Sequence, residues 1–260
     1  MAIYVSVVSH GHAVLINELL CLSSLSDDLN VVIKSNKPDD YFNDWICRKN
    51  YHWINEQYGY GFGHNNNIVF NFCKSKLGML DSDYFVVLNP DVIIESDAIE
   101  KLIGLMMLNK CKLAAINLYK DNDYTIYDNS IRRFPSMVNF GMSFLGLGNN
   151  SILGKSELLV PSYVDWAAGS FLAFNVEHYE ALGGFDEKYF MYCEDIDICY
   201  RSHLTGEKVL YFPNIRAIHL AMHNNRDLFS KHFYWHVKSV FRFLLRKVGV
   251  INTTRSLLKS

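Results

Sequence analysis

The chain has 260 residues, half of them hydrophobic, and a formal net charge of −2 at pH 7. This length accommodates one large α/β domain or two small ones, and the composition is that of a globular protein rather than a disordered one. The nearly balanced charge argues against general nucleic-acid binding, so we expect no nucleic acid among its partners.

Buried strands alternate with helices along the first half of the chain. The predicted strands are Ala2–Ser9, Val31–Ser35, Tyr51–Asn55, Tyr84–Leu88 and Leu113–Leu118. The predicted helices are His12–Leu25, Asp39–Asn50, one that begins near Asn65, and Ser96–Asn109. This alternation indicates an α/β fold with a mostly parallel central sheet that helices cover on both faces.

Four candidate ligand-binding positions lie just past predicted strand ends. They are Ser9, Asn36, Gly61 and Asp91. Ligands of such sheets bind beyond the carboxyl ends of the strands. We therefore expect these positions to share one site.

The loop GYGFG at 59–63 leads into three asparagines, Asn65, Asn66 and Asn67. It matches neither a Walker A motif nor GxGxxG after a first strand. Gly61 and Gly63 would let the backbone approach a ligand closely, and the asparagines would offer amide groups to a base or ribose. A plain loop with asparagine caps is the alternative.

Asp91 follows the buried strand YFVVL in the turn Asn89-Pro90-Asp91. A carboxylate there can hold Mg²⁺ or Mn²⁺ against a diphosphate, because hard cations prefer oxygen ligands. The alternative is an Asx-type turn, which is common in such sequences.

Periodicity fades between Tyr119 and Pro161, where we expect an irregular excursion that lines a substrate cleft. Order returns at Tyr163–Asn175 and continues through an acidic helix to a strand at Ile215–His219.

Three acidic residues, Glu194, Asp195 and Asp197, open the acidic helix. Acidic residues in a first helical turn also stabilise the helix dipole, and Asp197 stands four residues before Arg201, the spacing of a helical ion pair. Asp195 differs, because the aromatic run before it predicts a semi-buried carboxylate. Its raised pKa would suit a general base.

His219 ends the last predicted strand. It is a candidate third ligand for a metal at Asp91. His223 raises the alternative of a zinc site of the form HxxxH, but no glutamate adjoins His219 and no third ligand is evident.

At these motifs the chain resembles family 2, GT-A-fold, inverting glycosyltransferases. Within that group it is similar to the bacterial rhamnosyltransferases of O-antigen and cell-wall lipid-linked saccharide assembly. The matching segments span residues 6–219 and are VVSHGH, GYGFGHNNN, YFVVLNPDV, VDWAAGSF, GGFDEKYFMYCEDIDICYR and AIH.

The resemblance implies a role for each matched residue. Asp91 takes the metal role of the DxD motif, whose first position here is Asn89, which leaves one anionic ligand fewer. Asp195 takes the catalytic-base role of the ED motif with Glu194 beside it, and His219 completes the metal or diphosphate contact. The implied donor-binding residues are Ser9, His10, Asn36, Gly61, Gly63, Asn66, Asn67, Asn89, Asp91 and Arg201. The implied acceptor-binding residues are Trp166, Gly169, Ser170 and Glu194.

The resemblance also implies the reaction. The donor would be dTDP-β-L-rhamnose, the acceptor a polyprenyl-diphosphate-linked N-acetylglucosamine, and the cofactor Mg²⁺ or Mn²⁺. Two alternatives stay open: the same mechanism with a UDP-hexose or UDP-galactofuranose, and a non-catalytic saccharide-binding protein on this fold.

We expect a glycosyltransferase domain over 1–225 and a helical tail over 226–260. Within the tail, Phe229–Val248 carries apolar residues at helical spacing interspersed with Lys231, Lys238, Arg242, Arg246 and Lys247. Such a helix packs on the domain, faces an anionic membrane, or does both.

Two further features concern location. Six cysteines without a CxxC pair favour reduced thiols. The sequence shows no signal peptide and no run near the ~20 apolar residues of a membrane span. We therefore expect a cytoplasmic protein, peripheral at the inner face of the plasma membrane.

Overall fold

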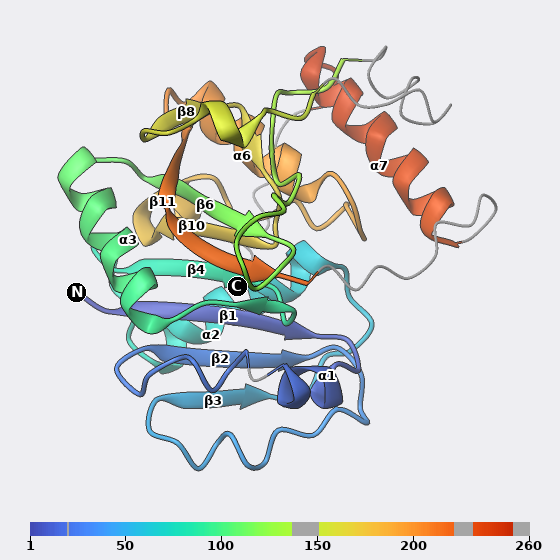
Figure 1. Cartoon of the computed structure of the whole chain (residues 1–260). Coiled ribbons are helices and arrows are strands. Elements are labelled where there is room, and N and C mark those ends of the chain that lie inside the picture. The colour runs from blue at the N-terminus through green and yellow to red at the C-terminus, as the bar shows by residue number, and fades with distance from the viewer. Residues whose placement is uncertain (20, 137–150, 221–230, 252–260) are drawn as a thin grey trace.

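The structure is a computed structural model that describes residues 1–19, 21–136, 151–220 and 231–251. Its described residues form a central sheet of nine strands, drawn in Figure 1, in the order β3-β2-β1-β4-β10-β6-β11-β5, with β8 paired to β11. The strands of this sheet are β1 (Ile3–Ser9), β2 (Asn30–Ser35), β3 (Tyr51–Ile54), β4 (Tyr84–Leu88), β5 (Val92–Ile93), β6 (Leu113–Tyr119), β8 (Ser162–Val164), β10 (Phe171–Asn175) and β11 (Val209–His219). A second, two-stranded sheet pairs β7 (Ile131–Arg132) with β9 (Trp166–Ala167).

The first four strands are parallel neighbours, as the strand–helix alternation predicts. Every residue of β1 and β4 is buried, which is typical of strands covered on both faces. Strand β10 runs antiparallel between β4 and β6, and β11 is parallel to β6. The carboxyl ends of β1, β2, β4, β6 and β11 therefore lie at one edge of the sheet, together with the amino end of β10.

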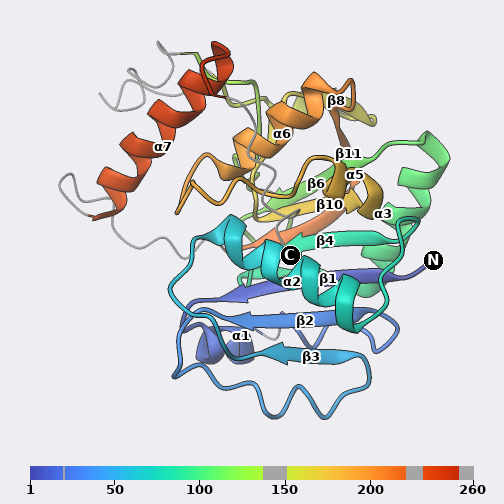
Figure 2. The same ribbon diagram turned by 180° about the vertical axis from the view of Figure 1, so that it is seen from behind.

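Two apolar layers flank the sheet (Figures 1 and 2). One contains α1 (Ala13–Glu18) and α3 (Ser96–Asn109), with Ile16 and Leu102 in its core. The other contains α2 (Phe62–Lys76), α5 (Val176–Ala181), α6 (Glu194–Leu204) and α7 (Lys231–Lys247). A 3₁₀ turn, η1, covers Lys155–Glu157.

Two helix predictions in the first half were wrong in extent or kind. The helix expected over His12–Leu25 spans only Ala13–Glu18, and the segment expected as a helix over Asp39–Asn50 consists of turns. The cause is a long-range contact: the carboxylate of Asp40 accepts hydrogen bonds from the backbone amides of Gly11 (3.3 Å) and Ala13 (2.9 Å). These bonds satisfy donors at the start of α1 and hold the later segment in a non-helical path.

Strand β11 has an irregularity that matters for the site. Its pairing register with β6 shifts between Phe212 and Arg216, where Pro213 supplies no ladder hydrogen bond. Beyond the shift, β11 pairs with β5, and His219 lies opposite Val92. The chain therefore brings His219 next to the turn that carries Asp91.

The carboxyl-terminal helix α7 packs on the domain. Val240 and Phe243 belong to the second apolar layer, and Phe243 contacts Tyr200 of α6 edge to face. The expected domain boundary at 225/226, His223 and the start of the tail near Phe229 lie outside the described residues. No helix in the described part of the chain is long and apolar enough to cross a membrane.

Candidate active site

A continuous series of contacts joins the predicted catalytic and metal residues at the carboxyl edge of the sheet. The backbone amide of Gly169 donates to the Asp195 carboxylate (3.1 Å), and the Asn89 amide donates to the Ser170 carbonyl (2.9 Å). Asp91 then contacts His219. The structure therefore brings together six residues that the sequence assigned to the site: Asn89, Asp91, Gly169, Ser170, Asp195 and His219.

His219 lies between two carboxylates. Its Nε2 is 3.4 Å from Asp91 Oδ1, and its Nδ1 is 3.2 Å from Asp128 Oδ2. Burial disfavours a charge on His219, but the two carboxylates outweigh it and raise the pKa to about 9. Burial likewise opposes ionisation of Asp91 and Asp128, yet contact with His219 lowers the pKa of both.

Asp128 was missed by the sequence reasoning, and so was Lys155 beneath it. Lys155 is buried and donates to the Leu118 carbonyl and to Ser130 Oγ, both at 2.9 Å. Burial lowers the pKa of Lys155 to about 7, although Asp128 opposes the shift. Both residues come from the stretch between Tyr119 and Pro161, where no periodic pattern marked them.

Asp91 and His219 have side chains that can serve as metal ligands, and Asp128 has the position of a carboxylate that orients the histidine ring. Among the described residues no cluster of three His, Cys, Asp or Glu side chains forms a ready metal site. However, a metal-binding histidine commonly donates its second ring nitrogen to a carboxylate, and Asp128 occupies that position. One carboxylate and one imidazole fit Mg²⁺ or Mn²⁺ whose other ligands are phosphate oxygens and water.

Buried Glu194 and half-buried Asp195 form a pair of carboxyl groups at the start of α6. Asp195 accepts hydrogen bonds from the amides of Gly169 and Ile196 (2.8 Å). Its pKa is raised by burial, the direction that the aromatic run predicts, while nearby Arg132 opposes the rise. Burial and the neighbouring Asp195 raise the pKa of Glu194 to about 8. Glu194 Oε2 has no hydrogen-bond partner among the described residues.

Four residues assigned to the donor have internal roles instead. A β-carbon on Gly61 would lie 2.2 Å from the Phe190 carbonyl oxygen, and one on Gly63 would lie 2.6 Å from Phe185 Cβ. These glycines therefore admit close packing of the chain on itself. Asn66 bonds to Ser6 Oγ and the Phe62 carbonyl. Asn67 bonds to Tyr179, to Glu187 and to the backbone of Phe185.

Arg201 was also assigned to the donor, and the structure contradicts this. Its guanidinium is buried and donates to Asp197 (2.8 Å) and to the carbonyls of Leu182 and Gly184. The predicted helical ion pair between Asp197 and Arg201 is confirmed, and it leaves this arginine unavailable to a diphosphate.

Three other residues assigned to the donor, Ser9, His10 and Asn36, lie at the carboxyl ends of β1 and β2. Ser9 is buried and accepts from the His12 amide (3.0 Å), while exposed His10 contacts the Asn36 amide group (3.0 Å). Asn36 also bonds to both backbone groups of Tyr60, and so joins two loops.

Trp166 is buried, and its placement does not support direct contact with the acceptor. Its indole donates to the Arg133 carbonyl (2.9 Å), and the Arg132 guanidinium lies over its ring. Arg132 itself is half-buried near Asp195, which makes it a cationic candidate that the sequence list omitted.

Comparisons with known proteins identify the class of the chain. The chain is 38% identical over 250 residues to the rhamnosyltransferase WbbL of Escherichia coli K12, covering 94% of this chain and 93% of WbbL. It is 31% identical over 176 residues to the N-acetylglucosaminyl-diphospho-decaprenol L-rhamnosyltransferase of Mycobacterium tuberculosis, which covers 62% of this chain and 55% of that relative. No family model matches the chain.

Solved structures show the same fold. The structure of S. aureus TarS in complex with UDP-GlcNAc matches with a TM-score of 0.62 at 12% identity, covering 98% of this chain and 69% of that one. The structure of GalNAc-T7 with UDP, GalNAc and Mn²⁺ matches with a TM-score of 0.55 at 14% identity, covering 84% of this chain and 44% of that one.

The mostly parallel sheet thus has the GT-A fold, and the identity to WbbL over most of both chains shows a glycosyltransferase. Within that class, the chain belongs to the family of rhamnosyltransferases that includes WbbL. The resemblance of its motifs to this group is confirmed.

The raised pKa of Glu194 predicts a pH-dependent stability difference. The unfolded carboxyl ionises near its ordinary pKa of about 4.3, whereas the folded one keeps its proton to about pH 8. Its contribution to stability is therefore complete below about pH 4 and is lost as the pH rises to 8. Glu194→Gln should gain stability relative to the wild type across this range, as measured by denaturant unfolding at several pH values. A stability difference that stays constant with pH would contradict the shift.

Proposed function

We propose that the protein transfers L-rhamnose from dTDP-β-L-rhamnose, with inversion, to a polyprenyl-diphosphate-linked N-acetylglucosamine-type acceptor in O-antigen or surface polysaccharide assembly. The observation that carries this proposal is the Asp195 carboxylate, held by the Gly169 amide at the edge where Asp91 and His219 meet. The names of WbbL and of the mycobacterial relative support the sugar, and the latter supports the acceptor class.

In the proposed reaction Asp195 is the general base. It removes a proton from the acceptor hydroxyl as the oxygen attacks the anomeric carbon from the face opposite the diphosphate. Burial raises the proton affinity of this carboxylate, which suits a base that works near neutral pH. Glu194 retains its own proton to about pH 8, so it can contact an acceptor oxygen as a hydrogen-bond donor.

Positive groups on the donor side would stabilise the departing nucleoside diphosphate. The guanidinium of Arg132 is a candidate by its charge and its nearness to Asp195. His219, whose pKa is raised by its two carboxylates, would contribute a positive charge only while no metal ion is bound, because a metal-binding imidazole must be neutral. Asp91 and His219 would hold Mg²⁺ or Mn²⁺, with Asp128 fixing the imidazole ring. The ion would supply charge neutralisation of the diphosphate.

The first test of this function uses a synthetic lipid-linked acceptor with a panel of dTDP and UDP sugars and product detection by mass spectrometry. We expect transfer from dTDP-L-rhamnose and a loss of about 10²-fold or more in Asp195→Asn, the scale of general-base removal. Asp97→Asn, an exposed carboxylate on α3, is the control and should keep full activity. Transfer only from a UDP-hexose or UDP-galactofuranose would reassign the donor, whereas an active Asp195→Asn would refute the base.

The metal assignment predicts a loss of divalent-ion stimulation in Asp91→Ala together with weaker donor binding, measured by calorimetry with and without Mn²⁺. The reason is that Asp91 supplies the only carboxylate of the Asn89-Pro90-Asp91 turn. Asp123→Ala, in the exposed loop before Asp128, should behave as the wild type. Full wild-type activity in excess EDTA would show that cationic side chains alone support the diphosphate.

We propose further that the outer face of α7 contacts an anionic membrane surface. This face comprises Tyr234, Val237, Lys238 and Phe241, all exposed, and exposed Val248 follows the helix directly. The helix contains no acidic residue, and Lys231 and Lys247 are also exposed. The combination of exposed aromatic and basic groups on one helix is typical of interfacial binding.

The structure changes which substitutions test the membrane contact. Arg242 and Arg246 form buried ion pairs, so replacing them would change contacts inside the protein as well as the surface charge. The variant Lys231→Gln, Lys238→Gln, Phe241→Ser should lose co-sedimentation with phosphatidylglycerol vesicles, because each basic group near such a surface contributes about 1 kcal/mol. The matched control is Lys101→Gln, Lys110→Gln on α3, across the sheet. Equal loss of activity on soluble and lipid-linked acceptors would point to a role in the fold instead.

A further inference from the structure

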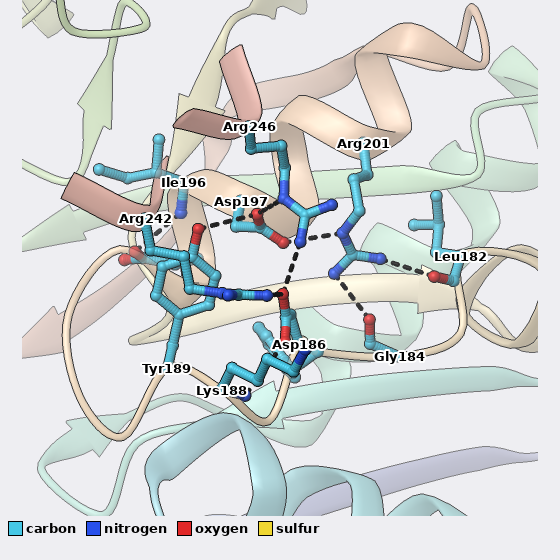
Figure 3. A network of polar contacts seen from close by, with 12 residues as sticks. Leu182, Gly184, Asp186, Lys188, Tyr189, Ile196, Asp197, Arg201, Arg242 and Arg246 are labelled. Atoms are coloured by element: carbon cyan, nitrogen blue, oxygen red, sulfur yellow. Dashed lines mark hydrogen bonds and ion pairs between the residues drawn. The ribbon is translucent and has the colours of Figure 1, made fainter. Parts of the chain in front are cut away.

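Two arginines of α7 reach buried carboxylates on either side of the acidic turn (Figure 3). Asp186 Oδ2 accepts from Arg242 Nη2 and from Arg246 Nη2, both at 2.5 Å, and the Arg246 Nε contacts Asp197 Oδ1. Asp186 and Asp197 are 1% and 0% exposed, and Arg246 is 5% exposed. Arg246 therefore bridges two carboxylates that lie 11 positions apart in sequence.

The same cluster includes groups from α6 and the segment before it. Tyr189 donates to Asp197 Oδ1 (3.0 Å), and Arg201 donates to Asp197 Oδ2 (2.8 Å). Burial would raise the pKa of Asp186, but the α7 arginines lower it. Since loss of one partner from a buried ion pair leaves an uncompensated charge, α7 is fixed firmly against this part of the chain.

The amino-terminal half of α7 contacts the turn that leads into α6. Ser239 Oγ donates to the Met191 carbonyl (2.8 Å), and Tyr192 OH lies 3.2 Å from His232 Nδ1. The rings of Phe190 and Trp235 are 4.5 Å apart between centroids. Helix α7 thus contacts three successive residues of this turn.

The turn has an unfavourable backbone conformation. Tyr192 and Cys193 have φ values of 70° and 64°, in the left-handed region that non-glycine residues rarely adopt. Cys193 occupies the N-cap position of α6 and supplies no side-chain cap. Such a conformation persists only where its surroundings impose it. Here the surroundings include α7 and the start of α2, where the Phe62 amide donates to the Phe190 carbonyl (3.1 Å). Glu194 and Asp195 follow immediately.

We propose that α7 is a positioning element of the active site, in which Arg246 and Ser239 hold the left-handed turn that places the Asp195 carboxylate. After Asp195 in the sequence, Arg246 holds Asp197 through an ion pair. Before Asp195, Ser239 holds Met191 through a hydrogen bond to its carbonyl. Asp195 lies between them and projects to Gly169 instead. The inference rests on the proposed role of Asp195 as the general base.

The test measures kcat and KM for Arg246→Gln and Ser239→Ala, each alone and combined with Asp195→Asn. Misplacement of a reacting group by about 1 Å costs up to roughly 10²-fold in rate, so we expect Arg246→Gln to lower kcat by about 10- to 100-fold with little change in donor KM. Ser239→Ala removes one hydrogen bond and should lower kcat by up to about 10-fold. Lys101→Gln, exposed on α3, is the control for kcat on a soluble acceptor.

The double variants separate positioning from general destabilisation. If α7 acts through Asp195, neither substitution should reduce the residual rate of Asp195→Asn further. An additive loss, or an unchanged kcat in folded Arg246→Gln and Ser239→Ala, would overturn the proposal. Should Arg246→Gln fail to fold, Ser239→Ala carries the test by itself. A fully active Asp195→Asn single variant would instead refute the assignment of the general base. This outcome is therefore distinguishable from a failure of the proposal on α7.

Discussion

The site depends on the antiparallel insertion of β10 between β4 and β6. This strand runs opposite to both of its neighbours, and it therefore starts at the edge where theirs end. The two residues just before it supply two backbone contacts: the Ser170 carbonyl accepts from the Asn89 amide, and the Gly169 amide donates to Asp195. These contacts join the turn of Asp91 to the start of α6. The distance between the proposed base and the proposed diphosphate site is thus set by the main chain.

Burial acts on every carboxylate of the site, and neighbouring charges decide its effect. Asp91 and Asp128 flank an imidazole, and Asp186 meets two guanidiniums, so the pKa of each is lowered despite burial. Glu194 and Asp195 have no such direct ion pair within the part of the chain that the structure describes, and their pKa values rise. These acids therefore fall into two groups: carboxylates with lowered pKa values, which contact cationic side chains, and a pair with raised pKa values, which suits acid–base chemistry.

The sequence predicted the elements that local periodicity determines. The strand at Tyr84–Leu88 and the helix at Ser96–Asn109 have the expected bounds, because buried apolar runs and helical spacing are short-range signals. It also predicted Asp91, Asp195 and His219, which stand at element ends. It failed for Asn66, Asn67 and Arg201, whose side chains satisfy buried groups more than 15 residues away. Asp128 was equally invisible, since only the register shift in β11 brings His219 beside it.

The basic residues of α7 show the same limit of local patterns. Lysines and arginines alternate with apolar residues along the helix, and composition alone cannot tell which ones meet carboxylates. Arg242 and Arg246 are one helical turn apart and share a face with Ser239 and Phe243, so they turn inward. Lys238 and Phe241 lie on the opposite face, which remains exposed. Packing and surface contact are therefore compatible in one helix, because the two roles use different sides of it.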